Sequence, residues 1–129
     1  MKYGYLCVAV CASVLAGVAA AAESGKTTLD NLQAAFNGES NANAKYTAFA
    51  AKADEEGYKS VAALFRAAAL AESIHAKKHA AVIKKLGAEP KADVGKPEVK
   101  STKENLENAL AGETYEKDTM YPGFIKQAQ

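Results

Sequence analysis

The sequence predicts an all-α protein built as a bundle of long helices. Apolar residues recur at spacings of three and four over two stretches, 28–56 and 60–86, and a glycine follows each stretch, which is the pattern of amphipathic helices. The second stretch has no strand signal and is rich in Ala and Lys, both strong helix formers. An internal repeat relates a third helix to the first. These three observations predict helices throughout.

The first 22 residues are expected to be a secretory signal peptide. Lys2 precedes the apolar run "YLCVAVCASVLAGVAAAA", which closes on small residues at Ala20 and Ala22. Cleavage after Ala22 fits this pattern, and cleavage after Ala20 or Ala21 fits nearly as well; the alternative is an uncleaved membrane anchor. Neither cysteine follows the small residue that lipid attachment needs. We expect a periplasmic or secreted protein whose domain spans 23–129.

The mature domain carries no surplus of charge. Without its first 22 residues the chain has 107 residues, with 15 basic and 15 acidic side chains and no cysteine. Disulfides, cysteine metal knuckles and cysteine nucleophiles are therefore excluded. No basic surplus exists to attract nucleic acid or anionic lipid, so neither nucleic acid nor, after signal cleavage, a membrane is an expected partner.

Two amphipathic stripes define the first two helices. The first helix carries its apolar residues at Leu32, Ala35, Phe36, Ala42, Tyr46, Phe49, Ala50 and Ala53. The second carries them at Val61, Leu64, Phe65, Ala68, Ala71, Ile74, Ala81, Val82 and Leu86. Gly57 and Gly87 are expected to end the two helices.

A loop and a capped third helix follow. The segment "AEPKADVGKPEVK", 88–100, holds two of the three prolines, which predicts a loop. Ser101 and Glu104 are spaced as a capping box that opens the next helix. Pro122 is expected to kink or weaken that helix near its end.

The third helix repeats the start of the first. "TLDNLQAAFNGE" (28–39) and "TKENLENALAGE" (102–113) agree at six of twelve positions, where ordinary amino-acid usage would give about one match by chance. The chain is therefore expected to be a duplicated two-helix hairpin. Positions equivalent to Glu72 and His75 would fall at 146 and 149, beyond Gln129, so the second copy is expected to be incomplete.

Five side chains form a candidate metal site. Glu72 and His75 are three apart on one helix face and can hold one ion, because carboxylate and imidazole both suit iron, manganese or zinc. Alone, this spacing is more often a solvated charged face. Glu39 and its repeat mate Glu113 each follow a glycine on the apolar side of a helix, where an unpaired carboxylate is costly. Glu116 lies one turn beyond Glu113 and adds a fifth candidate.

Three segments resemble the rubrerythrins, a family within the ferritin-like di-iron proteins. They are "AFNGESNANAKYTAFAAKADEEGY", "AALAESIHAKKH" and "NLENALAGETYEKDTMYPGF", and together they span nearly all of the mature chain. The resemblance implies a ferritin-like up-down helical bundle, here with three long helices of the usual four. In such bundles two helices give one Glu each and two give a Glu-x-x-His pair.

The resemblance also implies roles for individual residues. The expected metal ligands are Glu39, Glu72, His75, Glu113 and Glu116. Three residues are expected to act in catalysis: Glu116, the carboxylate that in the family shifts with iron redox state, and Tyr46 and Tyr121, which match tyrosines close to the iron pair. His79 is expected to be a helix-surface group or a neighbour of the ligands.

The implied function is reduction of hydrogen peroxide at a carboxylate-bridged, non-haem di-iron site, with manganese or zinc as alternative metals. Two family features have no counterpart in this sequence: the fourth helix with its second Glu-x-x-His, and the rubredoxin-like iron domain. We therefore expect an external electron donor, such as a small redox protein. The alternatives are a non-catalytic iron-binding or sequestering module and an inactive truncated fragment.

A homodimer is the expected assembly. Three helices of a four-helix bundle leave an apolar stripe open, which in soluble proteins usually marks an interface. Two facing hairpins, 28–87, would supply two copies each of Glu39, Glu72 and His75. The third helix would then pack outside or compete for the same seam; a swapped arrangement using that helix is the alternative.

Overall fold

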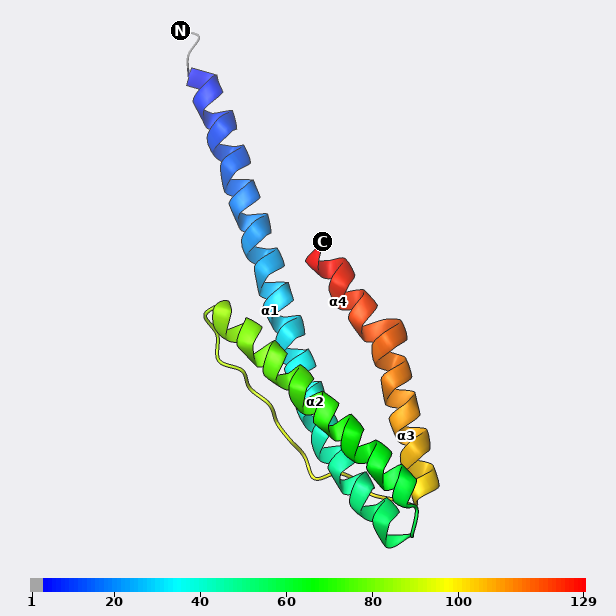
Figure 1. Ribbon diagram of the computed structural model, residues 1–129. Helices are drawn as coiled ribbons and strands as arrows, with labels where there is room; N and C mark the ends of the chain where they lie inside the picture. The colour runs from blue at the N-terminus through cyan, green and yellow to red at the C-terminus, as the bar shows by residue number, and fades with distance from the viewer. Residues whose placement is uncertain (1–3) are drawn as a thin grey trace.

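A central helix contacts a second helix on one side and a third, interrupted helix on another (Figure 1). The computed structural model describes the backbone of residues 4–129 and the side chains of residues 27–129. Within that range the elements are α1 (Gly4–Glu55), α2 (Lys59–Lys85), α3 (Thr102–Tyr115), a π-helical turn η1 (Glu116–Met120) and α4 (Tyr121–Ala128). The described chain contains no strand. The all-α prediction is confirmed.

The first helix extends further towards the N-terminus than the expected start at 28. α1 begins at Gly4, and the segment before residue 28 is rich in alanine and has no proline to stop a helix. The expected signal peptide, 1–22, lies outside the residues whose side chains are described. Across the described side chains, no helix combines the length and apolar character that crossing a bilayer requires.

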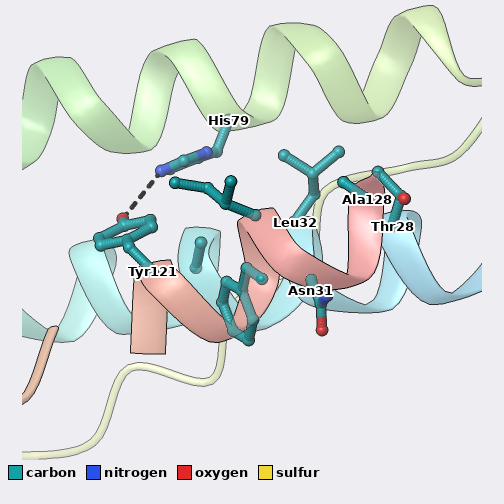
Figure 2. A pocket seen from close by; sticks show the side chains of 9 residues that line it. Thr28, Asn31, Leu32, His79, Tyr121 and Ala128 are labelled. Atoms are coloured by element: carbon teal, nitrogen blue, oxygen red, sulfur yellow. Dashed lines mark hydrogen bonds between the residues drawn. The ribbon is translucent and has the colours of Figure 1, made fainter. Parts of the chain in front are cut away.

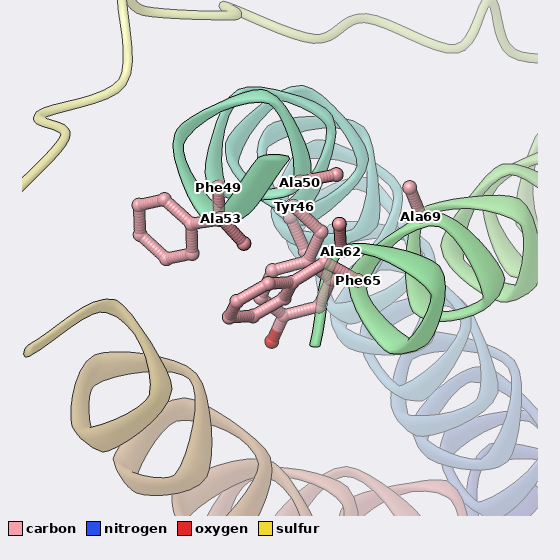
Figure 3. Close-up of a cluster of buried hydrophobic side chains, with 8 residues drawn as sticks. Tyr46, Phe49, Ala50, Ala53, Ala62, Phe65 and Ala69 are labelled. Carbon is pink, nitrogen blue, oxygen red and sulfur yellow. The ribbon is translucent and has the colours of Figure 1, made fainter. Parts of the chain in front are cut away.

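Aromatic rings and alanines join α1 to α2. Phe49 and Phe65 meet edge to face with ring centroids 5.4 Å apart, and Tyr46 lies 6.0 Å from Phe65. Aromatic pairs of this kind contribute about 0.5–1.5 kcal/mol beyond their buried area. The cluster around them is completed by Ala42, Ala50, Ala53, Ala62 and Ala69 (Figure 3). Gly57, at φ +85°, makes the tight turn between the helices.

The buried face of α2 differs from the predicted stripe. The residues that pack inward are Ala62, Phe65, Ala69, Glu72, Ala76 and Ile83. Of the predicted set, Phe65 is buried and Val61 and Ala68 pack half-buried against the core, whereas Leu64, Ile74, Val82 and Leu86 are exposed. The small alanine side chains let α2 pack closely against α1. The face that carries these alanines is therefore buried, and the face with Leu64 and Val82 is not. α2 thus carries a second apolar face that this chain leaves open.

The connection between α2 and α3 is held along α1 by a ladder of side-chain amides. Gln33, Asn37 and Asn41 lie four residues apart on α1, and their carbonyl oxygens accept the backbone N–H groups of Lys91 (3.1 Å), Asp93 (2.8 Å) and Gly95 (3.2 Å), respectively. The amides of Gln33 and Asn41 also donate to backbone carbonyls of Glu89 (2.7 Å) and Asp93 (2.9 Å). We call residues 88–100 the strap. The ladder satisfies the backbone of a segment that forms no regular structure.

The predicted capping box opens α3. Ser101 Oγ accepts the Glu104 N–H, and the Glu104 carboxylate accepts the Ser101 N–H at 3.2 Å. Glu56, at the end of α1, accepts the N–H of the buried Thr102 at 2.9 Å. The start of α3 is thereby fixed beside the α1–α2 turn.

Pro122 disturbs the third helix, as predicted, but through a π-turn. Pro122 lacks an N–H, and its ring would crowd the carbonyl of Asp118, four residues earlier. The chain widens over Glu116–Met120, where the Tyr121 N–H reaches back five residues to the Glu116 carbonyl, and resumes as α4. Such turns recur at functional sites, and this one lies between Glu113 and Tyr121.

Candidate metal centre

Two carboxylates lie buried between α1 and α2. Glu39 continues the stripe of Ala35 and Ala42, and Glu72 continues that of Ala69 and Ala76, so helical periodicity turns both side chains into the core. Glu39 is 3% exposed and Glu72 is 6% exposed. Carboxylates at such positions are costly unless they are paired, hydrogen-bonded or bound to a cation.

His75 joins the carboxylates at the open edge of the pair. One donor atom from each of Glu39, Glu72 and His75 lies within 4.8 Å of the others. His75 Nδ1 is 2.8 Å from Glu72 Oε2 and 3.7 Å from Glu39 Oε2. The His75 side chain is 50% exposed. The predicted combination of Glu39, Glu72 and His75 is therefore brought together, buried on one side and open on the other.

The two oxygens of Glu39 differ in their environment. Oε1 accepts a hydrogen bond from the Tyr121 hydroxyl, whereas Oε2 is buried and has no hydrogen-bond partner. A buried carboxylate oxygen without a partner is unfavourable in a neutral environment. A cation beside Oε2 would satisfy it, and two carboxylates with one imidazole form a donor set that suits iron, manganese or zinc. The residues present fit a metal ion.

The two carboxyl groups have opposite pKa shifts. Burial raises the pKa of Glu72 to about 7, and the neighbouring carboxylate of Glu39 acts in the same direction. Burial also raises the pKa of Glu39, but the adjacent Glu72 carboxyl, the hydrogen bond from Tyr121 and the charges of His75 and His79 together outweigh burial, so its pKa is lowered. Of the metal-free pair, Glu72 is therefore the carboxyl that takes up a proton as the pH falls towards neutrality. A bound cation would displace that proton.

Glu113 reaches the centre through Tyr46. The hydroxyl of the buried Tyr46 donates to Glu113 Oε1 at 2.5 Å. This bond places the third helix beside the centre rather than outside the hairpin. Glu113 itself is exposed although it bonds to Tyr46 of α1. Its expected burial on the apolar side of its helix is therefore wrong, because α3 packs much less extensively against α1 than α2 does.

Glu116 lies next to the centre on the π-turn. Burial raises its pKa, and the charges of Glu39 and Glu113 raise it further. Its side chain lines a hollow together with Gly38 and Tyr46, but it does not belong to the group formed by Glu39, Glu72 and His75. The ligand roles of Glu113 and Glu116 remain predictions.

Tyr121 and His79 form a contact that the sequence did not reveal. Tyr121 was expected near the metal, and it donates to Glu39. His79, expected at the helix surface or beside the ligands, lies with Nε2 3.2 Å from the Tyr121 hydroxyl. Its position one turn after His75 was the only signal for this role.

We expect ligand substitutions to separate His75 from His79. Glu72→Ala or His75→Ala should lower bound iron per chain severely, beyond the roughly 10–100-fold loss of affinity that outer partners of a ligand usually cost. His79→Ala should retain most of the iron at saturating metal. Iron content after anaerobic loading and desalting measures this, and equal content in all three variants would contradict the assignment.

We expect the metal-free protein to lose stability as pH rises towards neutrality. Because the pKa of Glu72 is raised from 4.5 to about 7, the folded state binds more protons than the unfolded state between these values, so the free energy of unfolding falls across that window. The lowered pKa of Glu39 changes the free energy of unfolding only below about pH 4.5, the ordinary value for Glu. Urea unfolding between pH 5 and pH 8 should show a flatter profile for Glu72→Gln than for wild type or the surface control Glu107→Gln. Parallel profiles would refute the shift.

Comparison with known proteins identifies relatives. The family model named Rubrerythrin matches residues 30–129. Nigerythrin of Nitratidesulfovibrio vulgaris strain Hildenborough is 46% identical over 106 residues, covering 80% of this chain and 52% of that protein. A rubrerythrin of Porphyromonas gingivalis is 38% identical over 105 residues, covering 81% and 52%.

Solved structures agree with this result. The structure titled "Fully reduced state of nigerythrin (all ferrous)" superposes with a TM-score of 0.74 at 46% identity, covering 79% of this chain and 51% of that one. A partially reduced state of nigerythrin gives a TM-score of 0.73 at 45% identity, covering 79% and 50%. This chain thus spans about half the length of the relatives it matches. It belongs to the rubrerythrin family of non-haem di-iron proteins.

Proposed function

We propose that this protein is exported, binds non-haem iron between α1 and α2, and reduces hydrogen peroxide with electrons from an external donor protein. The observation that carries the proposal is the buried pair Glu39 and Glu72, with His75 beside it and one oxygen of Glu39 left without a partner. Membership of the rubrerythrin family supports iron as the metal.

The chain's side chains divide the work of binding. Glu39, Glu72 and His75 would hold the metal, with Glu113 and Glu116 approaching from the third helix. Glu72, whose pKa burial raises to about 7, would give up the proton it binds more readily than Glu39 as the ion enters. Tyr121 orients Glu39, and Tyr46 orients Glu113.

Proton supply follows from the same groups. Hydrogen peroxide takes up two electrons and two protons and leaves as two waters. When bound, iron held by Glu39, Glu72 and His75 would supply redox and Lewis-acid chemistry for cleavage of the O–O bond. Burial raises the pKa of Tyr46 and of Tyr121, so both phenols keep their protons at neutral pH and can donate hydrogen bonds. Glu116, whose pKa burial also raises, can carry a proton beside Glu39. The external donor restores the electrons after each turnover.

Peroxide and dioxygen distinguish this proposal from iron sequestration. Hydrogen peroxide should oxidise the ferrous-loaded protein at least about tenfold faster than dioxygen, a difference of about 1.4 kcal/mol in barrier. Stopped-flow absorbance under anaerobic mixing measures both rates, with Glu72→Ala as the metal-depleted control. Equal rates would favour a sequestering module instead.

We also propose that two copies pair through the open face of α2. His75 shares that face with Leu64 and Val82, which lie eleven residues before and seven residues after it, so all three fall on one stripe. Leu64 and Val82 are exposed and the His75 side chain is half-exposed. A second copy would cover this stripe and bring its own Glu39, Glu72 and His75 to the shared centre.

Pairing should couple to metal binding. Light scattering with iron titration should find a dimer that binds about two irons per pair of chains and loses them on dissociation. Leu64→Asp should abolish both, while Leu70→Asp, an equally exposed leucine on another face of α2, should preserve both. A monomer that retains iron at high dilution would refute this pairing.

Export is the remaining part of the proposal. The basic residue, apolar run and small-residue end of 1–22 support cleavage near Ala22. Protein purified from its native source should begin near Glu23 in N-terminal sequencing and should fractionate outside the cytoplasm. Intact Met1 in the soluble cytoplasmic fraction would rule out cleavage.

A further inference from the structure

His79 is well placed to act on Tyr121. It lies on α2 with its side chain 21% exposed, and Nε2 is 3.2 Å from the Tyr121 hydroxyl. The two rings are nearly parallel, with an interplanar angle of 16° and centroids 6.2 Å apart. Figure 2 shows the imidazole of His79 pointing at the Tyr121 hydroxyl across the gap between the helices.

The hydrogen bonds run in one direction. Tyr121 has a single hydroxyl hydrogen, and it donates that hydrogen to Glu39 Oε1. The hydroxyl oxygen must therefore accept from His79, which requires the hydrogen of the imidazole to be on Nε2. His79 Nε2 also lies 3.7 Å from Glu39 Oε1, beyond hydrogen-bond distance. His79 therefore donates to Tyr121, and Tyr121 donates to Glu39.

The surroundings favour this chain of donors. His79 and Tyr121 lie at one end of a pocket of about 200 Å³, whose other walls are mainly apolar and include Leu32, Ala35 and Phe124 (Figure 2). In a region with few polar partners a hydrogen bond is stronger than in water, and successive donors reinforce one another. Of the pocket's described polar side chains, Asn31 is engaged elsewhere, with Gln127.

These hydrogen bonds determine which oxygen of Glu39 has no partner. Tyr121 occupies Oε1, and this leaves Oε2 as the unpartnered oxygen on the side of His75 and Glu72. We propose that His79 is a positioning residue: by donating to Tyr121 it fixes which oxygen of Glu39 is presented to a metal ion. This inference rests on the proposed metal binding at the same centre.

Four variants separate the links of this chain. His79→Phe keeps an aromatic ring beside Tyr121 but removes the donor, whereas His79→Gln keeps an N–H donor. Tyr121→Phe removes the middle link, and the fourth variant combines His79→Phe with Tyr121→Phe. Each is titrated with Co²⁺ while its visible absorption is followed, and thermal unfolding checks that each variant is folded.

The expected pattern is specific. His79→Phe and Tyr121→Phe should each weaken Co²⁺ binding about tenfold, the scale typical of groups that orient a ligand. The double variant should bind as weakly as Tyr121→Phe alone, because both substitutions break the same chain. His79→Gln should restore most of the wild-type affinity. Unchanged affinity in His79→Phe, or additive losses in the double variant, would overturn the proposal.

A measurement without metal keeps the two proposals distinguishable. In the metal-free protein, the ¹³Cζ resonance of Tyr121 should shift in His79→Phe and return towards its wild-type position in His79→Gln. An unshifted resonance would overturn the positioning role even if metal binds. Failure of wild type to bind Co²⁺ or iron, with the resonance shifting as expected, would instead overturn the proposed metal function and uphold the contact with Tyr121.

Discussion

The burial of two facing carboxylates is the constraint on which this structure depends. Glu39 has alanines four residues before and three after it, and Glu72 has alanines three before and four after it. Because α1 and α2 run in opposite directions, these flanks match across the interface, and the small side chains bring the helices close on both sides of the pair. Close approach removes water from the carboxylates, and an unpaired charge there would cost several kcal/mol. The hydrogen bond from Tyr121, the contact with His75 and the raised pKa of Glu72 offset that cost.

The sequence predicted the helices because their signals are local. Glycines at helix ends and a capping box at Ser101 each depend on a few neighbouring residues, and both were confirmed. The buried face of α2 was mispredicted because that helix has two apolar stripes, and periodicity does not rank them. The face with Leu64 and Val82 has the larger apolar side chains, but the face with Ala62, Ala69 and Ala76 allows closer contact. Which face is buried depends on how both helices fit together.

The same difference between local and long-range signals applies to the candidate centre. Glu39, Glu72 and His75 could be proposed from sequence because helical spacing and an internal repeat place them on defined faces. The contact of His79 with Tyr121 joins residues 42 positions apart and depends on how the π-turn redirects the third helix after Glu116. No periodic signal encodes that redirection. The exposure of Glu113 likewise follows from the limited packing of α3 against α1, which the sequence of α3 alone does not set.

The amide ladder along the strap has a finite length that geometry imposes. Four helical residues advance about 6.0 Å, and two extended residues advance about 6.6 Å, so each rung drifts by about 0.6 Å while the helix turns by about 40°. Side chains can absorb that drift for three rungs. A fourth would pair position 45 with position 97, where the sequence has Lys45 and Pro97, a residue without an N–H. The N–H groups of every second strap residue face α1. Insertion of one residue into the strap would therefore turn the following N–H groups away from the amides. Insertion of two residues would keep those N–H groups facing α1.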